Sequence, residues 1–425
     1  MQIERIASTR PTVNTGTGIV HLGLGAFHRA HQAVYIEQYL ARQGGDWGIC
    51  SANIRANQTL VDQLSKAECS YYVVEYGSLD RVCVREIQAI RETLFAGTLT
   101  GREALLSRLA ALETRIVTLT VTEKGYYLEP STGLLQLEEP AIRHDLSNPQ
   151  SPQTAPGFLL EALNRRRLAD LPPFTVLSCD NMPQNGRRTR AAVLEMAKHQ
   201  SIELHNWIET SVSFPGTMVD RIVPAMTTDD FRRLEREINC CEPTAVICES
   251  FSQWVVEDNF SLGRPDWEPE GVQMVADGTP FETMKLRCLN GTHSTLAYLG
   301  YLAGYQTISD SVADPAFAAL LERLWREEIL PTVPQPEGEN LPAYCTALLE
   351  RYRNPAIRHR TWQIAMDGSQ KLPQRLLAPA AEALSAGHPV PGLALAVAAW
   401  MRYVGGSDET GQPIDVRDPL AARLR

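Results

Sequence analysis

Lys285, Asn290 and His293 occur together in the segment KLRCLNGTH and could carry out acid–base chemistry on an alcohol or a ketone. A lysine that can lose a proton, an amide N–H that can stabilise a developing oxyanion and an imidazole that orients both suit this reaction without a metal. If the segment begins a long α-helix, at about 100° per residue, the three side chains fall within roughly 140° of arc and can converge. A solvated lysine, a helix-capping asparagine and a core histidine are the structural alternative.

A second pattern, near the start of the chain, indicates a dinucleotide site. The apolar run GIVHL (18–22) is followed by GLG (23–25) and by a helix-compatible segment that extends to about Leu40. A strand, a glycine-containing turn and a helix, in this order, form the beginning of a dinucleotide-binding βαβ unit. The motif is incomplete, because His28 stands where the third glycine of GxGxxG would be.

In this unit the glycines would let the backbone approach a pyrophosphate, and the helix N-terminus would donate N–H groups to it. An arginine in the same segment could add a charge-assisted contact. The residues predicted to contact the dinucleotide are Gly23, Gly25, Ala26, Phe27, Arg29 and Asp180.

The segment after the second predicted strand, WGICSANI (47–54), bears on the choice between NAD and NADP. It reads ANIRAN (52–57) and contains no Asp or Glu to hold the adenosine ribose. Asn53 or Asn57 could hydrogen-bond a ribose hydroxyl instead, and Arg55 is nearby. We expect NAD as the cofactor, and NADP is not excluded.

Polar residues also follow two other predicted strands, IVTLTVT (116–122) and FTVLSC (174–179). Asp180 and Asn181 come directly after the second of these, in SCDNMPQNG (178–186), and TEKGY (122–126) follows the first. The carboxyl edge of an open α/β sheet is where ligands bind. An Asx turn is the structural alternative for the Asp-Asn pair.

The order of the elements predicts an α/β protein with two domains. Apolar strands alternate with helical patterns such as 102–112 and 157–167, which is typical of a doubly wound parallel sheet. From about residue 278 helical patterns follow one another without a clear strand. We expect a Rossmann-type dinucleotide-binding domain over residues 1–276 and a mostly α-helical substrate and catalytic domain over residues 277–425.

Composition excludes several classes of partner. The formal net charge is −10, whereas a nucleic-acid-binding surface carries an excess of basic residues. No run of about 18 apolar residues is present, so we expect no membrane span. The basic run GRRTR (186–190) is interpreted as solvated surface, a helix start or an anion contact.

The cysteines indicate a reduced compartment. Nine are scattered along the chain without a CxxC pair, which fits cytosolic thiols better than a disulfide framework. The usual zinc spacings are absent, and His28 and His31 have no nearby cysteine to complete a set, so no metal is expected. With no apolar run in the first residues, we expect no signal peptide and a cytoplasmic protein.

Taken together, these segments resemble the mannitol dehydrogenase family, the polyol-specific long-chain dehydrogenases. The resemblance covers nearly the whole chain and rests on six motifs: GLGAFHRAHQ (23–32), TEKGY (122–126), SCDNMPQNG (178–186), FPGTMVDRIVP (214–224), K-x4-N-x2-H (285–293) and DGSQKLP (367–373). Within the family, RHRTWQIAMDGSQKLPQR (358–375) and WVVEDNF (254–260) look most like the fructuronate reductases, also called mannonate oxidoreductases.

This resemblance implies a metal-independent, NAD-dependent oxidoreductase with its active site in a cleft between two domains. Lys285 would be the general acid/base, Asn181 and Asn290 the oxyanion hole, and His293 would orient the substrate oxygen. The implied substrate contacts are Asp220, Lys371, Arg360 and His359. The implied reaction interconverts D-fructuronate and D-mannonate, and the family is often monomeric.

One departure from the family bears on the substrate. Gln363 stands where mannitol dehydrogenases tend to carry a polyol-binding arginine. Arg358, His359, Arg360 or Arg375 could meet a substrate carboxylate instead. A mannitol or arabinitol 2-dehydrogenase acting on an uncharged polyol is the alternative enzyme, and a non-catalytic NAD-binding sensor is an alternative of another class.

Overall fold

The computed structural model describes residues 2–9, 16–129 and 132–424. The chain divides into two compact units, each described by itself below. The N-terminal unit comprises Ile3–Glu75 and Cys83–Gly278, and the C-terminal unit comprises Gln2, residues 76–82 and the chain from Thr279 on.

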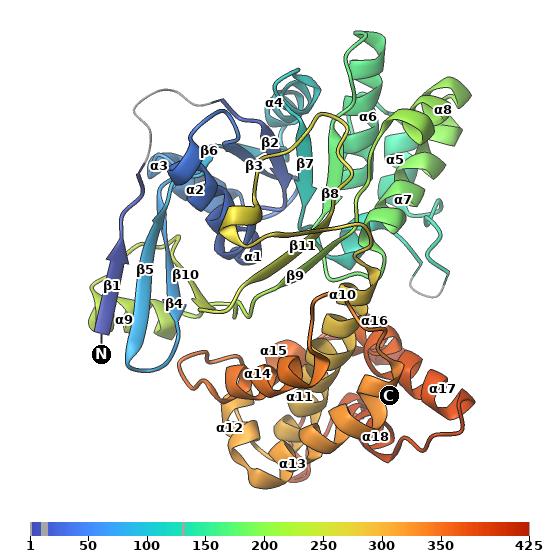
Figure 1. Cartoon of the computed structure of the whole chain (residues 1–425). Coiled ribbons are helices and arrows are strands. Elements are labelled where there is room, and N and C mark those ends of the chain that lie inside the picture. The colour runs from blue at the N-terminus through green and yellow to red at the C-terminus, as the bar shows by residue number, and fades with distance from the viewer. Residues whose placement is uncertain (1, 10–15, 130–131, 425) are drawn as a thin grey trace. The chain divides into compact units, whose positions relative to one another are not determined.

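A five-stranded parallel sheet is the centre of the N-terminal unit (Figure 1). In spatial order its strands are β6 (Ile90–Phe95), β3 (Ile49–Asn53), β2 (Ile19–Leu22), β7 (Ile116–Leu119) and β8 (Thr175–Ser178). All residues of its four strands other than the edge strand β6 are buried, as expected of a parallel sheet covered by helices, whereas β6 is mostly half-buried.

The order of these strands locates a ligand crevice. β2 pairs in parallel with β3 on one side and with β7 on the other, and the chain reaches β7 only after β3 and β6, so the strand order reverses between β2 and β7. Ligands of open α/β sheets bind at the carboxyl ends of the strands at such a switch point. The GLG segment follows β2 directly and therefore lies at this point.

Helices cover both faces of the sheet. Alternate side chains of each strand point to opposite faces, so neighbouring residues of one strand pack against different helices. Val20 and Leu22 belong to one apolar cluster together with α4, α6, α7 and α8, whereas Ile19 belongs to another with α2 and α3. The helices of this unit are α1 (Ala26–Ala30), α2 (Gln32–Gln43), α3 (Gln58–Lys66), α4 (Leu99–Ala110), α5 (Pro140–Ser147), α6 (Ala155–Leu168), α7 (Asn185–Gln200), α8 (Ile202–Ser211) and α9 (Thr228–Ile238).

The helix expected after the glycine turn is interrupted. α1 ends at Ala30, and α2 begins at Gln32, with His31 between them at φ −125° and ψ −87°. The basic run GRRTR lies in the first turns of α7, which begins at Asn185, so its interpretation as a helix start is confirmed.

Two smaller sheets were not predicted from the sequence. One has the order β1 (Gln2–Ile6), β5 (Arg81–Ile87), β4 (Tyr71–Tyr76) and β10 (Val246–Glu249). The other has the order β12 (Gln273–Val275), β11 (Gln253–Glu257) and β9 (Thr217–Asp220), with β9 and β11 antiparallel.

From Thr279 on, the described residues form helices and no strand longer than an isolated bridge. The α-helices are α10 (Thr279–Met284), α11 (Thr292–Leu302), α12 (Ile308–Ala313), α13 (Pro315–Leu324), α14 (Leu341–Arg353), α15 (Thr361–Ala365), α16 (Gly368–Leu372), α17 (Ala378–Ser385), α18 (Pro391–Val404) and α19 (Ala421–Leu424). Three π-helical segments join some of them: η3 (Lys285–Gly291), η4 (Trp325–Ile329) and η6 (Pro373–Leu377).

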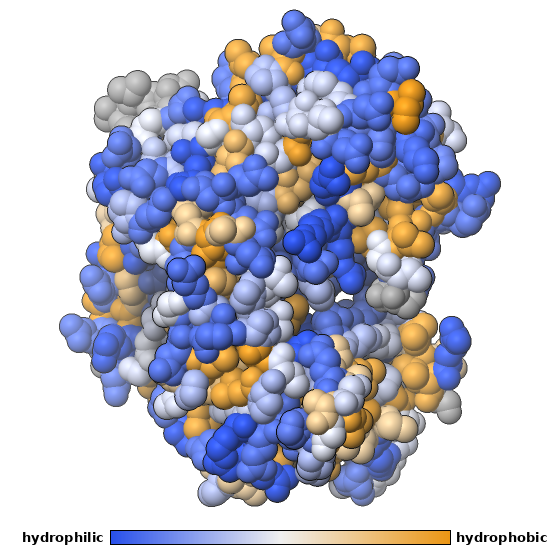
Figure 2. Space-filling model, turned by 45° about the vertical axis from the view of Figure 1, so that its right-hand side comes forward, coloured by the Kyte–Doolittle hydropathy of each residue, from blue (hydrophilic) through white to orange (hydrophobic). Residues whose placement is uncertain are grey.

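The surface is mixed in character. Figure 2 shows apolar side chains distributed among polar ones on the face turned to the viewer. Among the described residues, no helix is both long enough and apolar enough to cross a membrane.

Candidate active site

The turn after β2 requires glycine at position 23. Gly23 has φ +109°, and a Cβ added there would lie 2.1 Å from the carbonyl oxygen of Thr120. The Gly25 N–H donates to the Gly23 carbonyl at 2.7 Å, and Gly25 immediately precedes α1. The turn is therefore held tightly against the end of β7.

A cavity of about 270 Å³ opens at this turn. It lies at the carboxyl ends of β2, β3 and β7, where the strand order predicts a ligand crevice. Gly23 and Gly25 line it, together with Asn53, Arg55 and Tyr127 among others.

The other predicted cofactor residues do not line this cavity. Ala26 and Phe27 lie in α1 and pack against the apolar core. The guanidinium of Arg29 is buried and donates to the backbone carbonyls of Gly25 and Thr244. Arg29 thus joins the turn to a distant segment of the same unit.

Asp180 joins two strand ends. Its carboxylate accepts from the N–H groups of Val121 and Thr122, each at 2.9 Å, and from the Tyr126 hydroxyl at 2.8 Å. Desolvation raises the pKa of Asp180 to about 7, although these three donors act in the opposite direction. The carboxylate therefore fixes the TEKGY loop beside the cavity.

The lining of this cavity offers a hydrogen-bond donor to a ligand. The Asn53 side-chain amide is buried, and its Nδ2 has no hydrogen-bond partner within the part of the chain that the structure describes. A buried donor without a protein partner costs free energy unless a ligand or water accepts from it. Ribose hydroxyls and phosphate oxygens are such acceptors.

Sequence analysis did not identify Tyr127, Gln153 and Thr154 as lining residues of this cavity. Tyr127 directly follows the TEKGY motif, and Thr154 caps α6 by accepting from the Gly157 N–H at 3.0 Å. A threonine directly before a helical pattern predicts a helix N-terminus, and helix N-termini often bind anionic ligands, so Thr154 could have been identified from the sequence.

In the C-terminal unit, Lys285 and Asn290 lie on a π-helix, not on the α-helix that was predicted. In an α-helix the N–H of residue i+4 bonds back to residue i, whereas in a π-helix the bond spans five residues. Residues five apart consequently lie one above the other on the same face. Lys285 and Asn290 are five residues apart, so the π-helical spacing favours their convergence.

Lys285 and Asn290 on this π-helix, and His293 in the first turn of α11, are all buried. Lys285 is 5% exposed, and Asn290 and His293 are each 6% exposed. Asn290 Nδ2 and His293 Nε2 have no hydrogen-bond partner among the residues that the structure describes. Both atoms are therefore available to a bound molecule.

His293 is neutral at ordinary pH. Burial lowers the pKa of His293 well below its usual value, and the neighbouring His359, whose ring centroid is 4.6 Å away, lowers it further. Three positive charges contribute in the same direction: Arg375, Arg351 and Lys371.

The residues of this unit predicted to contact the substrate, His359, Arg360 and Lys371, lie in the segment 358–375. His359 has a pKa lowered to about 4 by burial and by Lys371. Lys371, in α16, donates to the carbonyls of Ile364 and Met366. Arg360 precedes the first turn of α15.

Asn181 and Asp220 belong to the N-terminal unit. Asn181 is exposed just beyond β8, and Asp220 is the last residue of β9 and is 1% exposed.

No group of three or more metal-binding side chains is present among the described residues. His28 is stacked on His21, with ring centroids 3.4 Å apart.

The fold and the cavity define a Rossmann-type protein with an additional helical unit. The model of the mannitol dehydrogenase Rossmann domain matches residues 17–269, and that of the mannitol dehydrogenase C-terminal domain matches residues 277–425. The chain belongs to the mannitol dehydrogenase family.

Individual relatives span nearly the whole chain. A D-mannonate oxidoreductase of Escherichia coli (strain K12) is 50% identical over 409 residues, which is 96% of this chain and 84% of the relative. A mannitol 2-dehydrogenase of Aspergillus fumigatus is 40% identical over 418 residues, covering 96% of this chain and 82% of the relative. The solved structure of Pseudomonas fluorescens mannitol 2-dehydrogenase, a ternary complex with NAD and D-mannitol, superposes with a TM-score of 0.94 at 39% identity, over 99% of this chain and 86% of that one.

Proposed function

We propose that this chain interconverts D-fructuronate and D-mannonate with NAD as the cofactor. The proposal rests on the positive charges of Arg375, Arg351 and Lys371 around the buried His293. An uncharged polyol does not need several cations beside it, whereas a sugar acid brings a carboxylate that they stabilise. The similarity to a D-mannonate oxidoreductase, at 50% identity, supports the same substrate.

The cofactor assignment uses the cavity at the end of β2. Gly23 and Gly25 give close backbone approach to phosphate oxygens, and Asn53 offers a buried donor to the adenosine ribose. NADH, when bound, supplies the hydride that reduces the ketone. In this proposal the domain over residues 1–276 binds the cofactor, and the domain over residues 277–425 supplies the acid–base groups.

Lys285 is the proposed general acid/base. In reduction its ammonium group delivers a proton to the carbonyl oxygen of the substrate, and in oxidation its neutral amine removes that proton from the alcohol. Asn290 Nδ2 donates to the same oxygen as negative charge develops on it, and Asn181 is proposed as a second donor.

His293 is proposed to position the substrate oxygen. Because the ring is neutral, it can donate from one nitrogen and accept at the other. Its Nε2, which lacks a protein partner in the described chain, is the atom offered to the substrate. His359, Arg360 and Asp220 are proposed as further substrate contacts.

Arg375 is the proposed partner of the substrate carboxylate. It is 7% exposed, its guanidinium donates to the Ser294 hydroxyl at 3.3 Å, and its charge acts on His293. A planar guanidinium can bind a carboxylate through two parallel hydrogen bonds.

The test compares substrates and variants by loss of the NADH absorbance. We expect turnover on D-fructuronate and much slower turnover on D-tagaturonate and D-fructose. Arg375→Gln should lower kcat/KM on fructuronate by about 10- to 100-fold, because a hydrogen bond to a charged group contributes about 1.5–3 kcal/mol. Arg353→Gln is the matched control, since Arg353 pairs with Glu350 at the surface.

The same experiment evaluates the alternative enzyme. The similarity to mannitol 2-dehydrogenases at about 40% identity favours a polyol substrate as the second candidate. Preference for fructose, with Arg375→Gln as active as the parent, would establish that candidate and exclude the uronate.

A further inference from the structure

We propose that the adenosine end of the dinucleotide cavity accepts a 2′-phosphate, so that the chain binds NADPH as well as NADH, with Arg55 as the specificity-determining residue. This inference rests on the proposed use of the cavity by a nicotinamide dinucleotide. It concerns the edge of the cavity formed after β3, where the ribose of such a cofactor lies.

The charge of this edge favours a phosphate. Among the described residues that line the cavity, Arg55 is the one with a formal charge, and neither an aspartate nor a glutamate is present. In NAD-specific Rossmann domains a carboxylate binds the 2′-hydroxyl and repels a phosphate, whereas an arginine accommodates it in NADP-dependent ones. This cavity has an arginine and no carboxylate among its described lining residues, as in the NADP-dependent domains.

Arg55 is also available to a ligand. Its side chain is exposed, and its guanidinium donates to two neutral groups: the Tyr127 hydroxyl at 3.0 Å and Gln153 Oε1 at 3.3 Å. A guanidinium that binds two neutral oxygens gains more from a dianionic phosphate, because charge-assisted hydrogen bonds are about twice as strong as neutral ones.

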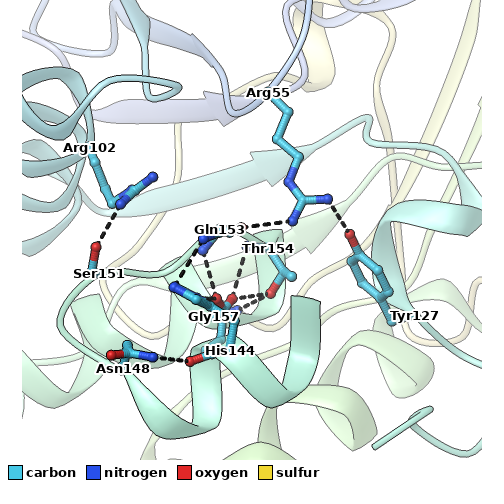
Figure 3. Close-up of polar contacts among 10 residues, drawn as sticks. Arg55, Arg102, Tyr127, His144, Asn148, Ser151, Gln153, Thr154 and Gly157 are labelled. Atoms are coloured by element: carbon cyan, nitrogen blue, oxygen red, sulfur yellow. Dashed lines mark hydrogen bonds and ion pairs between the residues drawn. The ribbon is translucent and has the colours of Figure 1, made fainter. Parts of the chain in front are cut away.

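A chain of hydrogen bonds keeps Arg55 at the cavity (Figure 3). The Gln153 amide that accepts from Arg55 donates in turn to His144 Nε2 at 3.0 Å, and His144 Nδ1 donates to Asp145 Oδ1 at 3.1 Å. Asp145 is buried and also accepts from the backbone N–H groups of Gln153 and Thr154. The amide oxygen of Gln153 is thereby turned toward Arg55.

Two further donors lie on the same edge. Asn53 Nδ2 is buried with no partner in the described chain, and it lines the cavity beside Arg55. The helix α3 begins after Asn57 with no side-chain cap and no acidic residue in its first turn, so its N-terminus favours an anion. Amide, guanidinium and helix terminus together form a set of donors with no carboxylate among the described lining residues.

The experiment is calorimetric titration of the whole chain with four compounds: NADH, NADPH, 5′-AMP and 2′,5′-ADP. The last two isolate the adenosine end and differ only in the 2′-phosphate. The variants are Arg55→Ala and Asn53→Asp, and the matched control is Arg102→Ala, whose guanidinium donates to Ser151 outside the cavity lining (Figure 3).

We expect 2′,5′-ADP to bind at least about tenfold more tightly than 5′-AMP, with the difference decreasing at high salt. Arg55→Ala should remove this gain and weaken NADPH binding by about 10- to 100-fold, with NADH binding changed less than about threefold. Asn53→Asp should weaken NADPH binding far more than NADH binding, because it introduces a carboxylate that repels the 2′-phosphate.

Two results would overturn the inference while leaving the proposed reaction in place. One is equal binding of 2′,5′-ADP and 5′-AMP by the parent chain. The other is an equal loss of NADH and NADPH binding in Arg55→Ala, which would assign Arg55 to the adenine ring. If neither NADH nor NADPH binds, the dinucleotide assignment itself is wrong.

Discussion

Replacing Asn290 with alanine should separate catalysis from stability. The Nδ2 atom of Asn290 is buried and has no partner among the described residues, so its removal breaks no hydrogen bond from that atom within the described chain. We expect the free energy of unfolding to fall by no more than about 1 kcal/mol. Loss of one oxyanion donor should lower kcat by about 10²–10³-fold, which corresponds to about 2.7–4 kcal/mol.

The contrasting control is Asn185→Ala. The amide of Asn185 donates to the carbonyls of Asp180 and Thr217 and accepts from the N–H groups of Gly186 and Thr217. Its removal leaves several buried groups unsatisfied, and we expect the free energy of unfolding to fall by about 2–4 kcal/mol.

The assays are urea unfolding and steady-state kinetics of NADH oxidation with fructuronate. A kcat of Asn290→Ala within about threefold of the parent would exclude Asn290 from oxyanion stabilisation. A loss of stability as large as that of Asn185→Ala would mean that the Asn290 amide supports the fold, and the reasoning from its missing partner would fail.

Three further outcomes are expected. Lys285→Ala should reduce kcat far more than the affinity for NADH, and a variant with parental turnover would remove Lys285 from the mechanism. Gly23→Ala should weaken NADH binding at least about tenfold and destabilise the chain more than Gly44→Ala, because both have positive φ but only Gly23 faces an atom within 4 Å. The pKa of Asp180, raised from 3.8 to about 7, predicts that its contribution to stability is present below about pH 4 and is lost as the pH rises through 7. Urea unfolding of the parent and of Asp180→Asn across this range should show a steeper decline in the parent, by at most about 1.4 kcal/mol per pH unit; equal slopes would refute the shift.

The strands and the glycine turn could be predicted because their signals are local. The run GIVHL forms β2, and the glycines after it line the cavity. The smaller sheets could not be predicted in this way, since strands such as β9 and β11 are short and are defined by partners distant in sequence.

The geometry of the candidate site could be predicted only in part from the sequence. The spacing of Lys285 and Asn290 indicated convergence, but a π-helix cannot be distinguished from an α-helix by apolar periodicity alone. The carboxylate of Asp180 was predicted at the correct sheet edge, and its hydrogen bonds to Val121 and Tyr126 depend on packing that a linear pattern does not contain.

The π-helix also places a constraint on the length of the chain between Lys285 and Asn290. Deleting one of the residues between Lys285 and Asn290 would leave them four apart, a spacing that matches an α-helical turn and not the π-helical one. All three residues would still be present, but the π-helical turn that sets their spacing would be lost. In this segment the number of residues is as much a determinant of the reaction as their identity, so single-residue deletions should be tolerated less than most substitutions.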